Sequence, residues 1–219
     1  NSIKNSDLKK ALAHEKDADE KDVYRYLGPD GFRKSKKIMP IKNPSNGKTI
    51  ANVQAISKEE IHEIFDSAKQ AQSLWAEKPI KERADILLEA ANLMDENKNI
   101  IAEAIMVSVA KSRKESLVEV ERSSEIIRET VKQALLTGEE VMPGDLVPSG
   151  SSRKEAHIRR MPLGVILAIP PFNYPLNLAV SKIAPALIMG NTMVLKPSTP
   201  GSLVGILIGA VFERAGLPN

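Results

Sequence analysis

The pattern of apolar and polar positions is helical across the middle of the chain. From Ser57 to Gly138, apolar residues recur every three or four positions, which is the period of an amphipathic helix. Ser57 and Glu60 fit a capping box before the first helix, and Pro79 ends or restarts the pattern. The spacing predicts four helices, at about 61–75, 80–97, 99–109 and 114–136. The apolar residues of the first helix keep to one helical face; they are Ile61, Ile64, Phe65, Ala68, Ala71 and Trp75.

On the N-terminal side of this block, short apolar pieces alternate with turn signals. Residues 23–55 contain the turn sequences LGPDG at 27–31 and NPSNGK at 43–48, which indicates strands joined by turns. Residues 1–22 are charged and have only a weak helical pattern. We therefore expect an extension or a fraying helix there.

On the C-terminal side, near-continuous apolar strands alternate with helices. This alternation predicts an α/β fold whose parallel strands are buried on both faces. Strands are expected at 164–169 and 192–195, and helices at about 176–189 and 201–215. Such sheets bind ligands beyond the carboxyl ends of their strands, where the sequences AIPPFNYP and LKPSTP lie.

These patterns divide the chain into four parts. We expect a charged extension (1–22), strands with a helical block (23–142), a loop with a strand (143–162), and the first βαβα units of a parallel sheet (163–219). Within the third part, 143–152 is predicted to be a loop and 153–161 an edge strand. The Lys and Arg residues of that strand can guard a free edge against aggregation.

The composition of the 219 residues is ordinary, with 42% hydrophobic and 27% charged residues. The net charge of +3 and the aromatic content of 4% do not favour nucleic acid as a partner. The absence of cysteine excludes disulfides, zinc–thiolate sites and a thiol nucleophile within these residues, and three scattered histidines do not predict a metal site.

The longest apolar region, 161–194, is interrupted by five prolines and Lys182, so we expect no membrane span. The first 22 residues have no apolar segment typical of a secretory signal, and we expect a cytoplasmic protein.

Asn173 lies among three prolines in the first of the two loops. Proline fixes its own φ and restricts the residue before it, so the backbone around Asn173 should be stiff. A carboxamide on a stiff loop can donate a hydrogen bond where negative charge develops in a reaction. The alternative is a helix N-cap, since asparagine is a favoured cap and a helix follows.

The second loop, KPSTP, begins with Lys196 at a strand end. A lysine with the hydroxyls of Ser198 and Thr199 at the start of a helix suits phosphate or ribose. The alternative is a solvated lysine before an ordinary Ser/Thr cap. Neither of the nucleotide-binding motifs G-x-G-x-x-G and G-x-x-x-x-G-K-[ST] occurs in the chain. The glycines of the following helix lie four apart on one face, which favours close packing of the helix over phosphate binding; they are Gly201, Gly205 and Gly209.

The stretch PLGVILAIPPFNYPLNLAVSKIAPALIMGNTMVLKPS strongly resembles the aldehyde dehydrogenase superfamily. The likeness rests on a P-[WF]-N-x-P loop, then A-P-A-L-x-x-G-N, then a K-P-[ST] strand end. The segment from Asn43 to Trp75 is also similar to that superfamily, and the likeness covers nearly everything after about Tyr24. The resemblance implies an incomplete aldehyde dehydrogenase fold, with 163–219 as the start of a Rossmann-like cofactor domain.

Within the superfamily, FNYP and VERSSEII are similar to the non-phosphorylating, NADP-dependent glyceraldehyde-3-phosphate dehydrogenases. This likeness implies that Arg122 binds the substrate phosphate and that Tyr174 lies beside the substrate. A guanidinium can bind phosphate oxygens bidentately. From the residues alone, the alternative for Arg122 is a surface ion pair with Glu119 or Glu125.

The resemblance also implies roles at the two loops. Asn173 would supply the oxyanion donor, and the cofactor would be bound by Ile169, Pro170, Pro171, Phe172, Lys196, Ser198 and Thr199. NADP is favoured over NAD because Thr199 stands where NAD-preferring relatives often carry a glutamate. A carboxylate there would repel a 2′-phosphate, whereas a hydroxyl can donate to it.

The chain departs from the family pattern in lacking the nucleophilic cysteine, and also a later glutamate and later arginines. We therefore interpret it as the N-terminal segment of an NADP-dependent aldehyde dehydrogenase, and expect no catalysis by these residues alone. The complete enzyme would oxidise glyceraldehyde 3-phosphate to 3-phosphoglycerate without phosphorylation. It would have a small-molecule aldehyde as its partner and form a homo-oligomer, a dimer or tetramer, through the strand at 153–161.

Two alternatives remain open from the sequence. One is an aldehyde dehydrogenase for a semialdehyde or another unphosphorylated aldehyde. The other is a naturally short, non-catalytic protein that binds a nucleotide or a partner chain, for which the missing cysteine is the best support.

Overall fold

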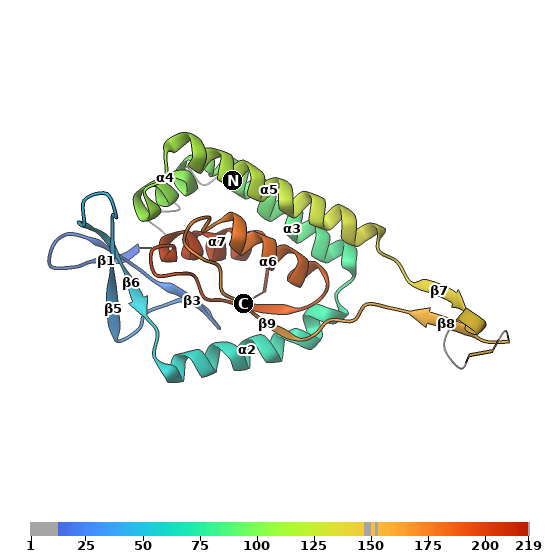
Figure 1. Cartoon of the computed structure of the whole chain (residues 1–219). Coiled ribbons are helices and arrows are strands. Elements are labelled where there is room, and N and C mark those ends of the chain that lie inside the picture. The colour runs from blue at the N-terminus through green and yellow to red at the C-terminus, as the bar shows by residue number, and fades with distance from the viewer. Residues whose placement is uncertain (1–12, 147–149, 152, 219) are drawn as a thin grey trace.

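A four-stranded sheet forms one end of the molecule (Figure 1). The computed structural model describes residues 13–146, 150–151 and 153–218, and the side chains from residue 16 onward. The order of the strands is β1-β2-β6-β5, in which β2 and β6 are parallel and the other pairs antiparallel. Their bounds are β1 Ala13–Lys16, β2 Asp22–Tyr24, β5 Lys37–Lys42 and β6 Thr49–Ala55.

The predicted strands and turns of 23–55 are confirmed. LGPDG joins β3 (Tyr26–Gly28) to β4 (Gly31–Arg33) in an antiparallel hairpin, and NPSNGK joins β5 to β6. The turn at 43–48 closes with a hydrogen bond of 2.9 Å from the amide of Asn43 to the carbonyl of Lys48.

The expectation of an extension or fraying helix is wrong for residues 13–16, which form β1. The backbone of β1 pairs with β2, and Lys16 forms an ion pair of 2.6 Å with Asp22. Pairing with a strand formed by other residues outweighs a weak local helical preference. Residues 1–12, which the same expectation covered, lie outside the described part.

The four predicted helices are confirmed, with shifts of a few residues at their ends. They are α2 Lys58–Glu77, α3 Ile80–Glu96, α4 Lys98–Val109 and α5 Arg113–Leu136. The capping box is present, because the Glu60 amide donates to Ser57 Oγ at 3.2 Å and the Ser57 amide to Glu60 Oε2 at 2.7 Å. The apolar face of α2 is buried unevenly, because Ile61 in its first turn is 44% exposed and only Trp75 of that set is fully buried. This helix lies along the outside of the molecule (Figure 1).

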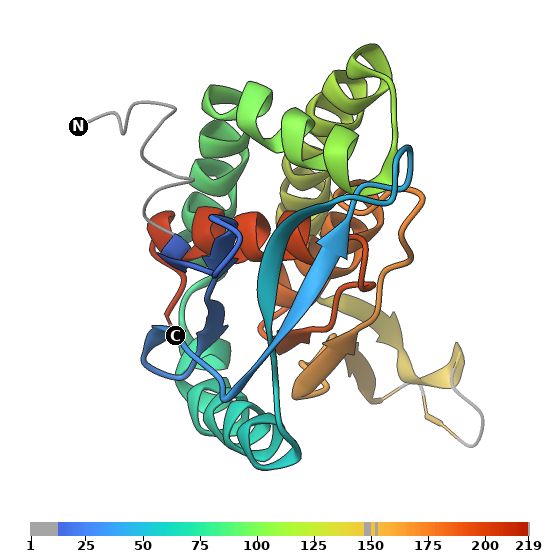
Figure 2. The same cartoon turned by 90° about the vertical axis from the view of Figure 1, so that its left-hand side faces the viewer.

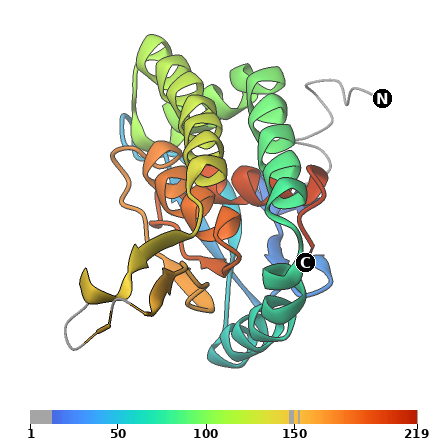
Figure 3. The ribbon, with the colours of Figure 1, turned by 90° about the vertical axis from the view of Figure 1, so that its right-hand side faces the viewer.

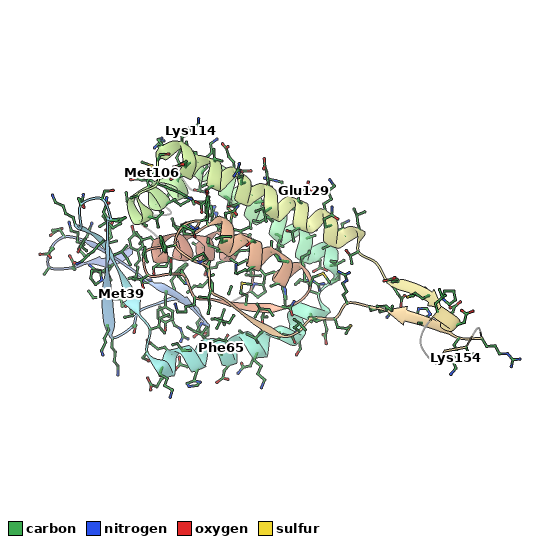
Figure 4. All side chains as sticks on the ribbon, in the orientation of Figure 1. Met39, Phe65, Met106, Lys114, Glu129 and Lys154 are labelled. Atoms are coloured by element: carbon green, nitrogen blue, oxygen red, sulfur yellow. The ribbon has the colours of Figure 1, made fainter. Side chains whose placement is uncertain are left out.

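A two-stranded hairpin projects from the body of the molecule (Figures 1 and 4). It comprises β7 (Glu140–Pro143), a short 3-10 helix η1 (Gly144–Leu146) and β8 (Glu155–Ile158). The predicted strand at 153–161 is confirmed over its central residues. Its partner β7 was not predicted, because a helix end precedes it and its four residues carry no alternating pattern. Residues 147–149 and 152 of the predicted loop lie outside the described part.

The C-terminal βαβα pattern is confirmed. It consists of β9 Val165–Ala168, α6 Asn177–Ile188, β10 Thr192–Leu195 and α7 Ser202–Arg214, with β9 and β10 parallel. The expectation that both strands are buried on both faces is wrong for β9, where Leu167 is 47% exposed. Side chains of a strand point to the two faces of the sheet, and the described residues only partly cover the face on which Leu167 lies.

The core lies between these layers. Helices α6 and α7 pack against α3, α4 and α5, and the β9–β10 pair lies between α6 and α2 (Figures 1 and 3). Figure 2 shows α7 beside the N-terminal strands, where Gly209 of α7 lets Leu27 of β3 approach. None of the described helices is long and apolar enough to cross a lipid bilayer.

The buried Arg83 joins the C-terminal ends of α2 and α6. Its Nε donates to the carbonyl of Ile188 at 3.0 Å, and its Nη1 donates to the carbonyl of Ala76 at 3.1 Å and to that of Lys78. Burial lowers the pKa of this guanidinium, which nevertheless stays charged in proteins. A cation at two helix C-termini is favourable because unpaired carbonyls and the helix dipoles point towards it.

Arg83→Ala is expected to lower the free energy of unfolding by about 2–4 kcal/mol, because several buried or partly buried carbonyls lose their donor together. Arg83→Lys should retain part of that stability. The measurement is urea unfolding followed by the fluorescence of Trp75, the sole tryptophan of the chain. Lys81→Ala, at an exposed position of the same helix, is the matched control. Equal stability of the Ala variant and the control would contradict this role.

Candidate functional site

The two proline-containing loops lie side by side at the carboxyl edge of the β9–β10 pair. Leu195 is in register with Ala168, and the amide of Lys196 continues the ladder with a bond of 2.9 Å to the Ala168 carbonyl. A Cβ placed on Gly201 would lie 3.1 Å from Cβ of Pro175, so the loops are also in contact further out. The juxtaposition that the strand order predicted is therefore confirmed.

Asn173 is exposed in the 169–176 loop and does not cap the helix. Helix α6 begins at Asn177 and its N-cap residue is Leu176, whose side chain forms no capping hydrogen bond. The N-cap alternative for Asn173 is therefore wrong. Pro175 explains the late start, since the residue before a proline is kept out of the helical region. Within the described residues, the Asn173 carboxamide has no hydrogen-bond partner and is free to meet a ligand.

The start of α6 is capped by a carboxylate from another helix. Glu119 of α5 is fully buried, and its Oε1 accepts from the amides of Leu176 at 2.9 Å and Asn177 at 3.2 Å. Its Oε2 forms an ion pair with Lys111 Nζ, which also lies 3.4 Å from the centroid of the Tyr174 ring. A buried carboxylate needs such compensation, because an isolated charge in a protein interior is costly.

Arg122 lies one turn beyond Glu119 on α5 and is exposed. Residues three apart on a helix are neighbours, so Arg122 stands next to the turn that caps α6. Among the described residues, it forms no ion pair with Glu119 or Glu125, and the carboxylate of Glu119 is engaged by Lys111. The ion-pair alternative is therefore wrong, and the guanidinium is available to an anion.

The 196–201 loop combines exposed donors with a tightly packed base. Lys196 and Thr199 are exposed, whereas Ser198 Oγ accepts from the Gly201 amide at 3.3 Å and so helps to start α7. A Cβ on Gly205 would lie 2.8 Å from Cγ of Pro197, which confirms that this glycine serves close packing. An ammonium and hydroxyls with no carboxylate between residues 196 and 202 suit an anionic ligand such as a phosphorylated ribose.

Asn191 holds the opposite end of β9. Its buried Oδ1 accepts from the amides of Leu163 at 2.6 Å and Gly164 at 3.0 Å, and its Nδ2 donates to the carbonyl of Ala186 at 3.1 Å. The side chain thereby ties the start of the strand to the end of α6. Both ends of the β9–α6 unit are thus fixed by buried polar groups.

Comparison with known proteins gives the same picture as the geometry. Residues 32–219 match the aldehyde dehydrogenase family. The chain belongs to this family. Over 202 residues it is 43% identical to the NADP-dependent glyceraldehyde-3-phosphate dehydrogenase of Pisum sativum. That alignment covers 90% of this chain and 41% of the relative. It is also 33% identical to a vanillin dehydrogenase of Corynebacterium glutamicum, in an alignment that covers 80% of this chain and 36% of the relative.

Solved structures of the family superpose on the chain. The NADP-dependent glyceraldehyde-3-phosphate dehydrogenase from Bacillus halodurans C-125, complexed with NADP, has a TM-score of 0.85 and 44% identity. The alignment covers 89% of this chain and 41% of that one. The sequence thus spans about two-fifths of the length of these relatives, and the fold seen here is part of the aldehyde dehydrogenase fold.

Sequence reasoning missed the roles of Lys111 and Glu119. The signal for Glu119 is its place in the buried stripe of α5, between Ser116 and Ser123, where a charged residue requires a partner. No local pattern marks Lys111, because it precedes α5 and one of its two contacts, with Tyr174, is distant in sequence. Among the described residues of this aldehyde dehydrogenase chain, no three His, Asp or Glu side chains are placed to hold a metal ion.

Proposed function

We propose that this chain provides the oxyanion donor and part of the cofactor site of an NADP-dependent aldehyde dehydrogenase. The proposed reaction is oxidation of glyceraldehyde 3-phosphate to 3-phosphoglycerate without phosphorylation. The observation that carries the proposal is the position of Asn173. It lies exposed and without a protein partner at the carboxyl edge of the sheet, beside the loop that presents Lys196 and Thr199.

Asn173 acts on the carbonyl oxygen of the aldehyde. When a nucleophile adds to the carbonyl carbon, negative charge moves to that oxygen, and the Nδ2 group donates a hydrogen bond to it. A donor that is held in place before the reaction stabilises this charge without reorganisation. The prolines and the capped helix start keep the loop in one conformation.

Lys196, Ser198 and Thr199 are proposed to face the ribose and 2′-phosphate of NADP, and residues 169–172 to line the cofactor site from the neighbouring loop. Ile169 and Phe172 are 55% and 58% exposed and offer apolar surface, next to the exposed Pro171 and the buried Pro170. When bound, NADP supplies the hydride acceptor of the oxidation. The relatives named as NADP-dependent support this assignment over NAD.

Arg122 and Tyr174 are proposed to bind the substrate. The guanidinium would pair with the substrate phosphate, and Tyr174, which is 45% exposed, would form a wall of the same site. The likeness to a vanillin dehydrogenase keeps an unphosphorylated aldehyde as the second candidate substrate.

The nucleophile and the group that activates the hydrolytic water are proposed to lie outside these 219 residues, since the sequence has no cysteine. A thiolate would add to the aldehyde, and after hydride loss water would release the carboxylate from the thioester.

We further propose that the complete protein is cytoplasmic and forms a dimer or tetramer through β8. Residues 23–142 and 163–219 are proposed to belong to one cofactor-binding unit.

Asn173→Ala in the complete enzyme is expected to lower kcat about 10²–10³-fold with little change in KM, because the lost interaction forms mainly in the transition state. The measurement is steady-state aldehyde oxidation at saturating NADP. Asn99→Ala, at an exposed asparagine on α4, is the control. An unchanged kcat in the Asn173 variant would refute the oxyanion role.

Arg122→Ala is expected to raise KM for glyceraldehyde 3-phosphate about 10–100-fold, because one charged hydrogen bond to the substrate phosphate is lost. The KM for unphosphorylated glyceraldehyde should stay the same, because that substrate has no phosphate. Arg113→Ala, on the first turn of the same helix, serves as the comparison. Equal effects on both substrates would favour an unphosphorylated aldehyde instead.

Thr199→Glu is expected to raise KM for NADP about tenfold or more, because a carboxylate would then face the 2′-phosphate. The KM for NAD should change little, since NAD carries a hydroxyl at that position. Thr199→Gln, which has the same length without the charge, separates repulsion from bulk. A glutamate variant that retains the original preference would contradict the proposed position of the 2′-phosphate.

A further inference from the structure

The ion pair of Lys111 and Glu119 touches the loop of Asn173 at two points. Glu119 Oε1 accepts from the amides of Leu176 and Asn177, immediately after the loop. Lys111 Nζ lies between Glu119 Oε2 and the ring of Tyr174, the residue directly after Asn173. Two charged groups from outside the loop thus hold both the backbone and a side chain next to Asn173.

The burial of these groups shows that the contact is built into the fold. The Glu119 side chain is 0% exposed and that of Lys111 is 14% exposed. A surface ion pair contributes little and is readily exchanged with water, whereas a buried one is fixed in geometry and costly to break. The ammonium over the aromatic face adds a cation–π attraction, which strengthens when the groups are desolvated.

The backbone before Lys111 is held in an uncommon conformation. Ala110 is in the left-handed region, with φ 53° and ψ 36°, and ends α4. An L-residue with a Cβ pays a steric penalty there, and such a conformation persists only where the surroundings fix it. It directs Lys111 from the α4–α5 connection into the space between Glu119 and Tyr174.

We propose that Lys111 and Glu119 are positioning residues that set the direction of the Asn173 carboxamide. This inference rests on the proposed function, because it assigns a role to the same loop. The pair acts through the loop: Glu119 fixes where α6 starts, and Lys111 fixes the ring of Tyr174. Loss of either contact lets the Asn173 donor move away from the reacting oxygen.

A double-mutant cycle in the complete enzyme tests this role. Lys111→Met is expected to lower kcat about 10–100-fold with KM little changed, since a small misplacement of a catalytic group has effects of that size. Lys111→Arg, which keeps a cation within reach of both partners, should recover part of the rate. In an Asn173→Ala background, Lys111→Met should cause no further loss of kcat, because the group that it positions is gone. Lys98→Met, which removes an exposed ion pair of 3.7 Å with Glu121, is the control with unchanged kcat.

A second measurement reports on the contact without catalysis. Amide hydrogen exchange at Leu176 and Asn177 should become faster in the double variant Lys111→Met/Glu119→Gln, since the charged acceptor is lost. Exchange in α3 should stay as in the parent protein. If Lys111→Met fails to fold, the same cycle is run with Lys111→Arg, whose smaller loss of kcat should also vanish in the Asn173→Ala background.

The outcomes distinguish the two proposals. Full kcat in Asn173→Ala overturns the oxyanion role itself. A second outcome is that Asn173→Ala lowers kcat, but the Lys111 substitution lowers kcat by the same factor in the parent enzyme and in the Asn173→Ala variant. That result overturns only the positioning inference. Unchanged kcat in a folded Lys111→Met variant, or unchanged exchange at Leu176 and Asn177, overturns it as well.

Discussion

The buried carboxylate of Glu119 is the interaction on which the arrangement of the site depends. It satisfies the first amides of α6, which have no acceptor within their own helix. It also brings α5 against the loop that follows β9. Without it, the start of α6 would leave buried amides unpaired, and the loop that carries Asn173 would lose its fixed end. Packing of α5 on α6 and the placement of the candidate site therefore have one common cause.

The site itself results from the order of the strands. Because β9 and β10 are parallel neighbours, the loops after them meet at one edge, although Asn173 and Lys196 are far apart in sequence. The same geometry brings a neutral donor beside a cationic loop without a carboxylate. Such an edge suits a reaction in which charge develops on a carbonyl oxygen next to a bound anionic cofactor. The chain belongs to the aldehyde dehydrogenase family, and members of it named as NADP-dependent match the chain over most of its length.

Much of the fold could be predicted because its signals are local. The capping box at Ser57, the period of α3 and the alternation of β9, α6, β10 and α7 lie within short stretches. Contacts made by single charged residues could not be predicted in this way. Arg83 and Glu119 are ordinary charged residues in helical sequence, and only the folded chain shows that carbonyls or amides of other helices surround them. Strand β1 was missed for a similar reason, since its partner β2 and not its own composition decides its structure.

The most direct test of the central claim is an assay of the complete protein with glyceraldehyde 3-phosphate and NADP in the absence of inorganic phosphate. The absorbance of NADPH is followed, and the product is identified by mass. The account predicts that NADP is reduced, that 3-phosphoglycerate is formed, and that NAD supports a slower reaction. A strict requirement for inorganic phosphate, or no reduction of NADP with any aldehyde, would contradict it.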